Sequence, residues 1–424
     1  MLRILAAALV LVVGVAEARD RRCRHARTSR TKDCASYAFF EFAPASGAGM
    51  TEACSCTSPT GARGEALTFT RTGAATCSKK GLATTGIANG DLVVCASNNQ
   101  PRVEPDADGV LGLRVEAART NSLLRSDELT VSPWADVGTP TVTDGATSPF
   151  GTATADTIDD NDAVAYEGRS QAVTVTSGAA YTLACYLKAG TASSARLLID
   201  GTAINATSLS STTWTRAEIA DAAASSTSIT VQVLVGDVTS VTGTVIFGGC
   251  DVQNGTYATA YIPTTSAAAT RNAESASLTF ASTFSNVNGS SLAGNISFPS
   301  GWTATPFDGL GSPYADAANR NQAYWQTSNA ITCSHISSGG NRDATVSGST
   351  PGTASQRMSC AQGAIGSGTL TATRNGVSGT PVALGTATAF TAIDWRGIGG
   401  LSTAAAASSI VSRLCYDPDA SRCR

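Results

Sequence analysis

The sequence predicts an all-β protein with two β-sandwich domains in tandem behind a cysteine-rich N-terminal region. From about residue 140 onward, short runs of alternating apolar residues are separated by Gly, Asn, Asp, Ser and Thr, as in 171–190 and 227–237. These runs are rich in the β-branched and aromatic residues that suit a pleated, half-buried surface. No stretch has a clear helical period with caps, and only 401–415 could form a helical turn or two. Antiparallel strands without crossover helices form sandwiches or barrels.

The N-terminus predicts export. Residues 1–18 combine a charged start, a short apolar run and the small-residue site Ala16-Glu17-Ala18, which is the pattern of a cleaved signal peptide. The apolar run is shorter than the ~20 residues that span a bilayer, and no later segment is long and apolar enough to do so. We therefore expect a mature chain that begins at Arg19 and is secreted or held at the cell surface.

Changes in amino-acid composition and pattern divide the mature chain into segments. Residues 19–62 are basic, irregular and Cys-rich; their arginine-rich start is either a solvated arm or a contact for an anionic surface. Residues 63–111 read as a β-hairpin lead-in with Gly turns, and 112–268 as the first sandwich. The polar segment 261–275 reads as a linker before the second sandwich, 269–424.

Two motifs carry a resemblance to a known family. The order LTFTRTGAAT (67–76), KKGL (79–82) and QPRVEPDADGVLGLRVEAARTNSLLRSDEL (100–129) is similar to a lead-in found in phage tail- and head-fibre proteins and exported bacterial proteins. The segment GGCDVQNGTYATAYIPTTSAAATR (248–271) resembles the end of their jelly roll. The resemblance covers residues 67–275 and implies a carbohydrate-binding-module-like jelly roll followed by a concanavalin-A-like sandwich. It implies attachment to carbohydrate rather than a defined reaction.

Segment 112–129 is unusually dense in charged and aliphatic residues, and we interpret it as the entry and first strand of the first sandwich. Arg119 and Asn121 can fix an irregular turn by side-chain to backbone hydrogen bonds. A ligand site formed by Glu116, Arg119 and Asn121 is the alternative. The aliphatic side chains expected to face the core are Leu113, Val115, Leu123, Leu124 and Leu129.

A structural calcium ion is the one cofactor that the resemblance implies. Jelly-roll carbohydrate modules often hold such an ion between acids near the first and last strands, which here correspond to Asp127 or Glu128 and Asp251. Gln253 stands where the fibre family has a glutamate, which weakens the correspondence. Five acids in 155–169 form either a second calcium candidate or a solvated acidic loop, because their spacing is not that of an EF-hand.

The 12 cysteines predict disulfides, since no zinc-type C-x-x-C pair occurs. The jelly-roll order would bring Cys185 and Cys250 side by side on neighbouring strands. The other expected pairs are Cys333 with Cys360, Cys415 with Cys423, and Cys77 with Cys95, with Cys23, Cys34, Cys54 and Cys56 pairing among themselves.

Catalytic equipment is scarce in the sequence. There are only two histidines, His25 and His335, and no G-x-S-x-G elbow. No strand in the second sandwich carries the alternating carboxylates of a sandwich glycosidase. A net charge of −3 with 14% charged residues gives no basic field for nucleic acid.

Aromatic rings are the usual sugar platforms, because flat rings pack against the C–H faces of pyranoses. Trp134 and Trp214 fall in strand patterns and are expected in the core. The Gly/Pro-rich segment 301–326 combines rings with Asp, Asn, Arg and Gln, and exposure of its rings is as plausible as burial. The carbohydrate-binding residues expected there are Trp302, Tyr314, Tyr324 and Trp325.

These features favour a secreted, non-catalytic protein that binds a polysaccharide or cell-surface glycan. A structural fibre or coat component is the alternative, and a polysaccharide-degrading enzyme is the third possibility. Neither the sugar nor the oligomeric state follows from the sequence.

Overall fold

The structure, a computed structural model, describes residues 38–40, 66–238, 242–300, 302, 308–326, 328–349, 354–389, 391–396, 398 and 409–417. The expected signal peptide, the start at Arg19 and nearly all of the Cys-rich segment 19–62 lie outside these residues. All of the regular secondary structure in the described part consists of β-strands, which confirms the all-β prediction. Residues 409–415 belong to a strand, so the helical turn expected in 401–415 is wrong for them. The described residues form no helix that could cross a membrane.

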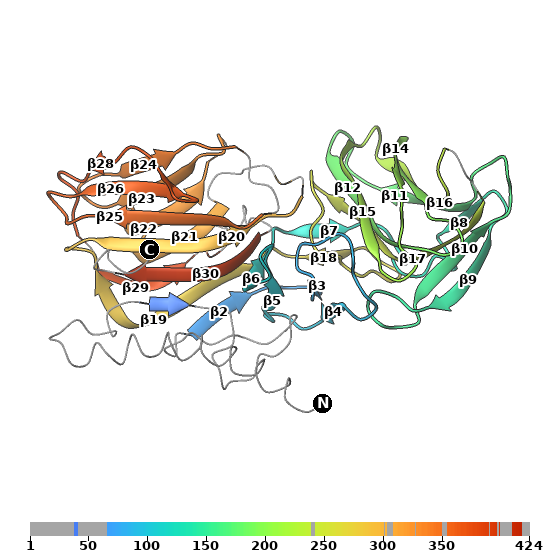
Figure 1. The fold of residues 1–424 in the computed structure, drawn as a ribbon, viewed down its shortest axis with the longest axis horizontal. Helices are drawn as coiled ribbons and strands as arrows, with labels where there is room; N and C mark the ends of the chain where they lie inside the picture. The colour runs from blue at the N-terminus through green and yellow to red at the C-terminus, as the bar shows by residue number, and fades with distance from the viewer. Residues whose placement is uncertain are drawn as a thin grey trace, which may run out of the picture.

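Two β-sandwiches lie side by side along the long axis of the molecule (Figure 1). The first is formed by residues 119–271 and consists of two sheets, which we call sheets I and II. Sheet I has the order β15-β12-β17-β10-β9, with β7 beside β17 and β18 beside β7. Its strands are β7 (Arg119–Asn121), β9 (Thr141–Ala146), β10 (Ala155–Asp160), β12 (Ala180–Ala189), β15 (Thr215–Ala223), β17 (Gly243–Asn254) and β18 (Ala269–Arg271). Sheet II has the order β14-β13-β16-β11-β8, with strands β8 (Ala135–Val137), β11 (Gly168–Thr174), β13 (Ala195–Ile199), β14 (Thr202–Ala206) and β16 (Ser228–Val235).

The core of the first sandwich follows from period-two alternation. On β12 the inward residues are Tyr181, Leu183, Cys185 and Leu187, and on β16 every second residue from Ile229 onward is buried in the same cluster. Alternate side chains of a strand face opposite sides, so each strand supplies one apolar row to the core. Trp134 also lies in this cluster, as expected.

The second sandwich consists of sheets III and IV. Sheet III has the order β27-β26-β25-β20-β30-β6-β5, with β1 beside β30 and β28 beside β26. Its strands are β1 (Ala38–Phe40), β5 (Arg102–Pro105), β6 (Leu111–Val115), β20 (Ser290–Ser297), β25 (Gln356–Gln362), β26 (Thr369–Arg374), β27 (Val377–Ser378), β28 (Val382–Ala383) and β30 (Ser409–Asp417). Sheet IV has the order β2-β19-β29-β21-β22-β23-β24, with strands β2 (Ala66–Thr70), β19 (Ser275–Ser285), β21 (Asp308–Asp316), β22 (Asn319–Trp325), β23 (Ile331–Ile336), β24 (Arg342–Val346) and β29 (Thr391–Arg396).

The first sandwich is inserted into the second. Strands β2, β5 and β6 precede it in sequence but pair with β19, β30 and one another in sheets III and IV. Segment 112–129 is therefore divided. Leu113 and Val115 lie in the core of the second sandwich, whereas Leu123 and Leu129 lie in that of the first and Leu124 is half-buried. The boundary falls after Val115 rather than at residue 112, because β6 completes sheet III.

The remaining lead-in covers the outer face of sheet I. Strands β3 (Ala75–Ser78) and β4 (Leu92–Cys95) form a hairpin, and Ile87 between them makes a β-bridge with Trp214. Ile87, Trp214 and Tyr261 belong to a small separate core under this cover. Trp214 is thus fully buried, as expected, but outside the main core.

The structure confirms two of the expected disulfides. Cys185 and Cys250 are directly paired on β12 and β17 and are bonded. The bond between Cys333 and Cys360 joins β23 to β25 and so links sheet IV to sheet III.

Cys77 and Cys95 are each disulfide-bonded and form a buried cluster of their own, which supports the predicted hairpin clip. The partner proposed for Cys415, Cys423, lies outside the described residues, as do Cys23, Cys34, Cys54 and Cys56.

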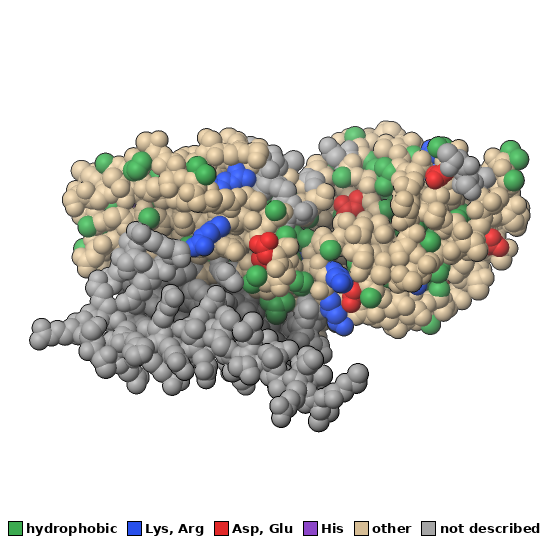
Figure 2. All heavy atoms as spheres, viewed as in Figure 1, with side chains coloured by type: hydrophobic (Ala, Val, Ile, Leu, Met, Phe, Trp, Pro, Cys, Tyr) green, Lys and Arg blue, Asp and Glu red, His purple; other side chains and the backbone are tan. Residues whose placement is uncertain are grey.

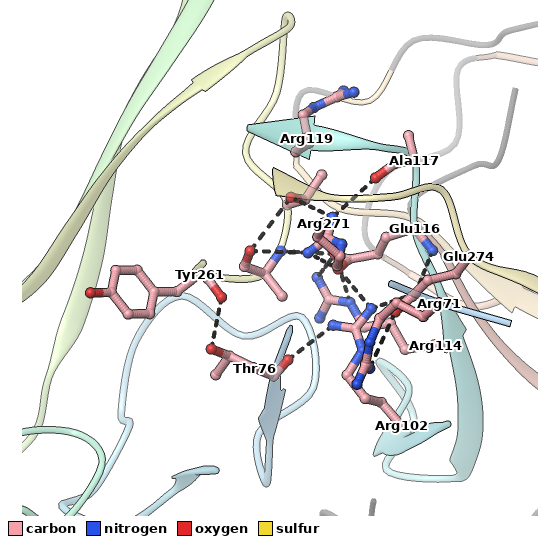
Figure 3. Close-up of polar contacts among 12 residues, drawn as sticks. Arg71, Thr76, Arg102, Arg114, Glu116, Ala117, Arg119, Tyr261, Arg271 and Glu274 are labelled. Atoms are coloured by element: carbon pink, nitrogen blue, oxygen red, sulfur yellow. Dashed lines mark hydrogen bonds and ion pairs between the residues drawn. The ribbon is translucent and has the colours of Figure 1, made fainter. Parts of the chain in front are cut away.

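A buried network of charged side chains lies where the two sandwiches meet (Figure 3). The carboxylate of Glu116, just after β6, lies 2.8 Å from the guanidiniums of Arg102 and Arg271 and 2.6 Å from that of Arg114. Since Arg271 ends β18 while Arg102 and Arg114 lie on β5 and β6, these ion pairs join one sandwich to the other. We call this set of side chains the Glu116 network, and none of them is more than 5% exposed. Its members are Arg71, Arg102, Arg114, Arg271, Glu104, Glu116 and Glu274.

The arginines control the ionisation of Glu116. Burial alone would raise its pKa, but the guanidiniums of Arg114, Arg271 and Arg102 hold the pKa well below the ordinary value. The backbone N–H of Ala260 also donates to Glu116 Oε1 at 2.8 Å. The carboxylate is therefore ionised and bonded on several sides, which is the condition under which a buried charge is tolerated.

We expect Glu116→Gln to lower the free energy of unfolding by ~3–5 kcal/mol, because three buried guanidiniums would then surround an uncharged amide. Chemical denaturation followed by tryptophan fluorescence measures this. Glu128→Gln is the matched control: it breaks an ion pair with Arg125 whose side chains are 31% and 44% exposed, so we expect a loss below ~1 kcal/mol. Equal losses in the two variants would contradict a special role for the network.

Candidate functional site

Trp302 and Trp325 lie in the core of the second sandwich. Their side chains are 3% and 0% exposed. Phe298 stacks on Trp302 with ring centroids 3.9 Å apart and meets Trp325 edge-on at 5.1 Å. Trp325 shares the inward side of β22 with Ala323. The expectation that these two indoles form a sugar platform is therefore wrong; they fill the space between sheets III and IV.

Tyr314 and Tyr324 lie on the opposite, outer side of sheet IV. Because Ala323 and Trp325 face the core, their neighbour Tyr324 faces away from it. Tyr314 is paired across the strands with Arg320, which is four residues from Tyr324 and on the same side of β22. Two of the four predicted residues thus share one face, and the other two lie behind it.

The centre of this face is polar but closed to solvent. Gln322 pairs with Ser334, whose hydroxyl donates to Asp343 Oδ1 at 2.5 Å and lies 3.4 Å from the hydroxyl of Tyr324. Gln322, Ser334 and Tyr324 are 6%, 3% and 9% exposed, and Thr332 beside them is fully buried. Tyr324 therefore contributes hydrogen bonding within the face rather than an exposed ring.

One rim of the face is accessible. Arg396 on β29 is exposed, and its guanidinium carbon lies 4.2 Å from the ring centroid of Tyr314, which is half-buried like Arg320 beside it. We call Tyr314, Arg320 and Arg396 the Tyr314 rim. The tight turn that follows is fixed by Asp316, which accepts hydrogen bonds from Ala318 N and Asn319 Nδ2 at 2.8 and 3.0 Å. The rim presents one aromatic ring beside two guanidinium groups.

Sequence reasoning missed both arginines. Arg320 could have been found, because it shares the outward side of β22 with Gln322 and Tyr324 at spacings of two and four. Arg396 is 82 positions after Tyr314 in the printed sequence, and only the pairing of β29 with β21 brings them together. No local signal indicates that pairing.

Asn121 has the structural role that the first interpretation of segment 112–129 gave it, and Glu116, named only for the alternative ligand site, is structural as well. Asn121 is fully buried; its Oδ1 accepts from Leu123 N and Val252 N, each at 3.0 Å, and its Nδ2 donates to Ile262 O at 2.8 Å. Arg119 makes the expected kind of bond, since its guanidinium donates to the carbonyl oxygen of Ala118 at 3.0 Å, and it also lies over the ring of Tyr257, 4.9 Å from its centroid. Because Asn121 and Glu116 are satisfied by the protein itself, the alternative ligand site has no support here.

The carboxylates expected to hold calcium have other partners. Asp251 accepts from Gln253 Nε2 at 2.8 Å and lies 3.3 Å from Arg216, while Glu128 pairs with Arg125 at 2.8 Å. Within the described ranges, no three or more His, Cys, Asp or Glu side chains are grouped as metal ligands. The residues named by the resemblance, Asp127 among them, thus do not fit a calcium site by themselves, and calcium binding stays a prediction without geometric support.

The acidic segment 155–169 is partly built into the first sandwich rather than wholly solvated. Asp160 is 1% exposed and its carboxylate accepts from Glu167 N and Asp162 N at 2.8 and 2.9 Å. Asp156, also 1% exposed, accepts from Leu129 N and is paired across β9 and β10 with Asp144. These acids fix backbone turns.

His335 lies inside the second sandwich. Its Nδ1 is 2.8 Å from Asn321 Oδ1 and its Nε2 is 3.1 Å from the carbonyl oxygen of Thr388. The ring is fully buried, and this burial lowers its pKa. These neighbours are amide and carbonyl groups rather than the serine and aspartate of a hydrolase triad.

The chain matches no protein-family model and no curated protein sequence. Two solved structures are similar over much of its length. One is the N-terminal CBM22-1–CBM22-2 tandem domain of Xyn10C from Paenibacillus barcinonensis, at 9% identity and a TM-score of 0.26, covering 71% of this chain and 98% of that one. The other is a carbohydrate esterase of the Shiga toxin-encoding bacteriophage phi24B, at 10% identity and a TM-score of 0.18, covering 70% and 96%. Likeness at this level carries no argument about function, which must rest on the residues of this chain.

Trp325→Ala should cost ~3–5 kcal/mol of stability, because it leaves a large cavity between sheets III and IV. Tyr314→Ala, a truncation of a half-buried ring at the rim, should cost ~1 kcal/mol or less. Denaturation midpoints of both variants test the assignment. Equal denaturation midpoints of the two variants would contradict the burial of Trp325 in the core and the position of Tyr314 at the rim.

Asp156→Asn should stabilise the protein in a pH-dependent way. Burial raises the pKa of Asp156 to about 6, with Asp144 and Asp127 adding to the rise and the N–H of Leu129 opposing it. Since this folded-state pKa exceeds the ordinary value of ~4, the stability contributed by the group is complete below about pH 4 and is lost as pH rises through about 6. The increase in the free energy of unfolding caused by the substitution should therefore grow between pH 4 and pH 8, by at most ~3 kcal/mol. Urea denaturation at both pH values measures it, and a gain independent of pH would contradict the assignment.

Proposed function

We propose that the protein is an exported, non-catalytic polysaccharide-binding protein and that the Tyr314 rim is its contact with the polymer. The observation that carries this proposal is the accessible cluster of Tyr314, Arg320 and Arg396 on the outer face of sheet IV. Arg396 lies over one face of the half-buried Tyr314 ring, so a sugar would contact the part of the ring that Arg396 leaves uncovered and accept N–H bonds from the guanidinium groups. A ring flanked by two such donors has the chemistry that a pyranose needs.

The low charge of the chain supports a neutral polymer, because its net charge is −3 and only 14% of its residues are charged. On the one face that Figure 2 shows, the coloured charged side chains of the described residues are small groups among uncharged ones. Such a surface offers hydroxyls and amides rather than a field that would attract nucleic acid or an anionic membrane. A single shallow sugar site of this kind binds weakly, with a Kd of ~mM to μM, so repeated sites on the polymer would matter.

Export is supported by the signal-like N-terminus and by the two buried disulfides, which persist in oxidising compartments. The absence of an evident acid–base pair in the sequence supports binding without cleavage. Release of reducing ends from a polysaccharide incubated with the protein would overturn this part of the proposal.

A structural component of a fibre or coat is the second candidate. The observation that favours it is the Glu116 network, which joins the two sandwiches through buried ion pairs and thus suits a part that transmits force or holds a spacing. Sedimentation of the purified chain separates the candidates: filaments or defined oligomers without glycan retention favour assembly.

Tyr314→Ala should weaken polysaccharide binding at least tenfold, about 1.4 kcal/mol or more, with little change in melting temperature. A glycan array followed by affinity electrophoresis in the retained polysaccharide measures the loss. The matched control is Tyr166→Ala in the first sandwich, where a half-buried tyrosine likewise lies under an arginine, Arg196, at 5.2 Å. Equal retention of the wild type and the Tyr314 variant would exclude the rim as the site.

A further inference from the structure

A pocket lies between the covering hairpin, the outer face of sheet I and the second sandwich. It encloses about 30 Å³, which is room for one or two hydroxyl-sized groups rather than a whole ligand. Polar side chains from all three parts line it, among them Thr84, Arg114, Tyr186, Arg216, Glu218 and Ser300. The pocket therefore depends on the joint between the sandwiches.

Strand pairing brings three of these side chains together. Tyr186 on β12 is paired with Arg216 on β15, and Glu218 is on the same side of β15, two residues further. Their neighbours Cys185, Ala217 and Ile219 belong to the inner core, so the three polar side chains face outward into the pocket. The guanidinium of Arg216 lies over the Tyr186 ring, 5.5 Å from its centroid.

The three groups retain hydrogen-bonding capacity. Arg216 and Glu218 are 3.9 Å apart, too far for a hydrogen bond, and their side chains are 10% and 19% exposed. Arg216 has only long bonds of 3.3 and 3.4 Å to Asp251. Within the described part of the chain, the side chains of Glu218 and Tyr186 make no hydrogen bond. The pocket thus offers an acceptor, a donor and a hydroxyl within one cluster.

Three charged side chains line the pocket, Arg114, Arg216 and Glu218, and both arginines already have carboxylate partners. Arg216 lies between Asp251 and Glu218, and Arg114 lies between Glu104 and Glu116. A free anion would compete with these carboxylates, and a free cation would meet the guanidiniums. The arrangement suits a neutral group that both donates and accepts, which is a hydroxyl.

We propose that this pocket is a second binding site, which takes two neighbouring hydroxyls at the edge of one sugar residue. One hydroxyl donates to Glu218 and accepts from Arg216, and the other bonds to the hydroxyl of Tyr186. The enclosed volume admits the hydroxyls, while the sugar ring stays outside, on the side of the exposed lining residues Ala83 and Ser300. The site involves no residue of the Tyr314 rim and stands independently of it.

Saturation-transfer NMR with the full chain and the methyl glycosides of glucose, galactose and mannose tests this site. We expect millimolar binding of at least one glycoside and loss of its signal with the corresponding deoxy sugar that lacks one of the two hydroxyls. Tyr186→Phe, which removes one oxygen atom, and Glu218→Gln should each weaken binding at least fivefold. Tyr166→Phe is the matched control and should leave the signal unchanged.

The outcomes separate this site from the rim. Tyr314→Ala should keep the glycoside signal, and Tyr186→Phe should keep polysaccharide retention through the rim. If no glycoside gives a signal, or if both pocket variants bind as well as the wild type, the assignment is overturned. Melting curves of each variant confirm that a lost signal reflects the site rather than the fold.

Discussion

The arrangement of the whole chain depends on one buried carboxylate, that of Glu116. Removing a carboxylate from water costs several kcal/mol, and three guanidiniums within 2.8 Å supply the opposing attraction. Arg102 and Arg114 belong to β5 and β6 of the second sandwich and Arg271 to β18 of the first, so the carboxylate has all three partners only when the two sandwiches are docked together. The network thus links the two sandwiches, and one of its members, Arg114, also lines the pocket at the joint.

The sequence predicts the strands well because alternation is a local property. The apolar rows of 171–190 and 227–237 become β12 and β16, and the cysteines on neighbouring strands are bonded as expected. It does not predict the insertion. Leu113 and Leu123 are both aliphatic residues in one dense segment, and nothing local tells which of two cores each will enter. That choice is made by pairing of β6 with β30, almost 300 residues later in the sequence.

The candidate site was predictable in part for the same reason. In segment 301–326 the adjacent Tyr324 and Trp325 must face opposite sides of a strand, so one of them had to be buried. Only the packing of Phe298 against both indoles decides that the tryptophans are the buried pair. Arg396 and the pocket residue Arg216 come to their sites through sheet pairing with distant strands, which no spacing in the sequence reveals.

A fixed joint also changes how the two proposed sugar sites would act together. The rim lies on the outer face of the second sandwich and the pocket lies at the joint between the two sandwiches, which the Glu116 network links. For a ligand that spans both sites, the second contact forms at an effective concentration set by that geometry, while a monosaccharide gains nothing from it. Neither site then needs high affinity of its own. If both proposed sites bind sugar, selectivity for a long polymer over its free sugar units would follow from their fixed separation, and it would weaken if the buried ion pairs at the joint were loosened.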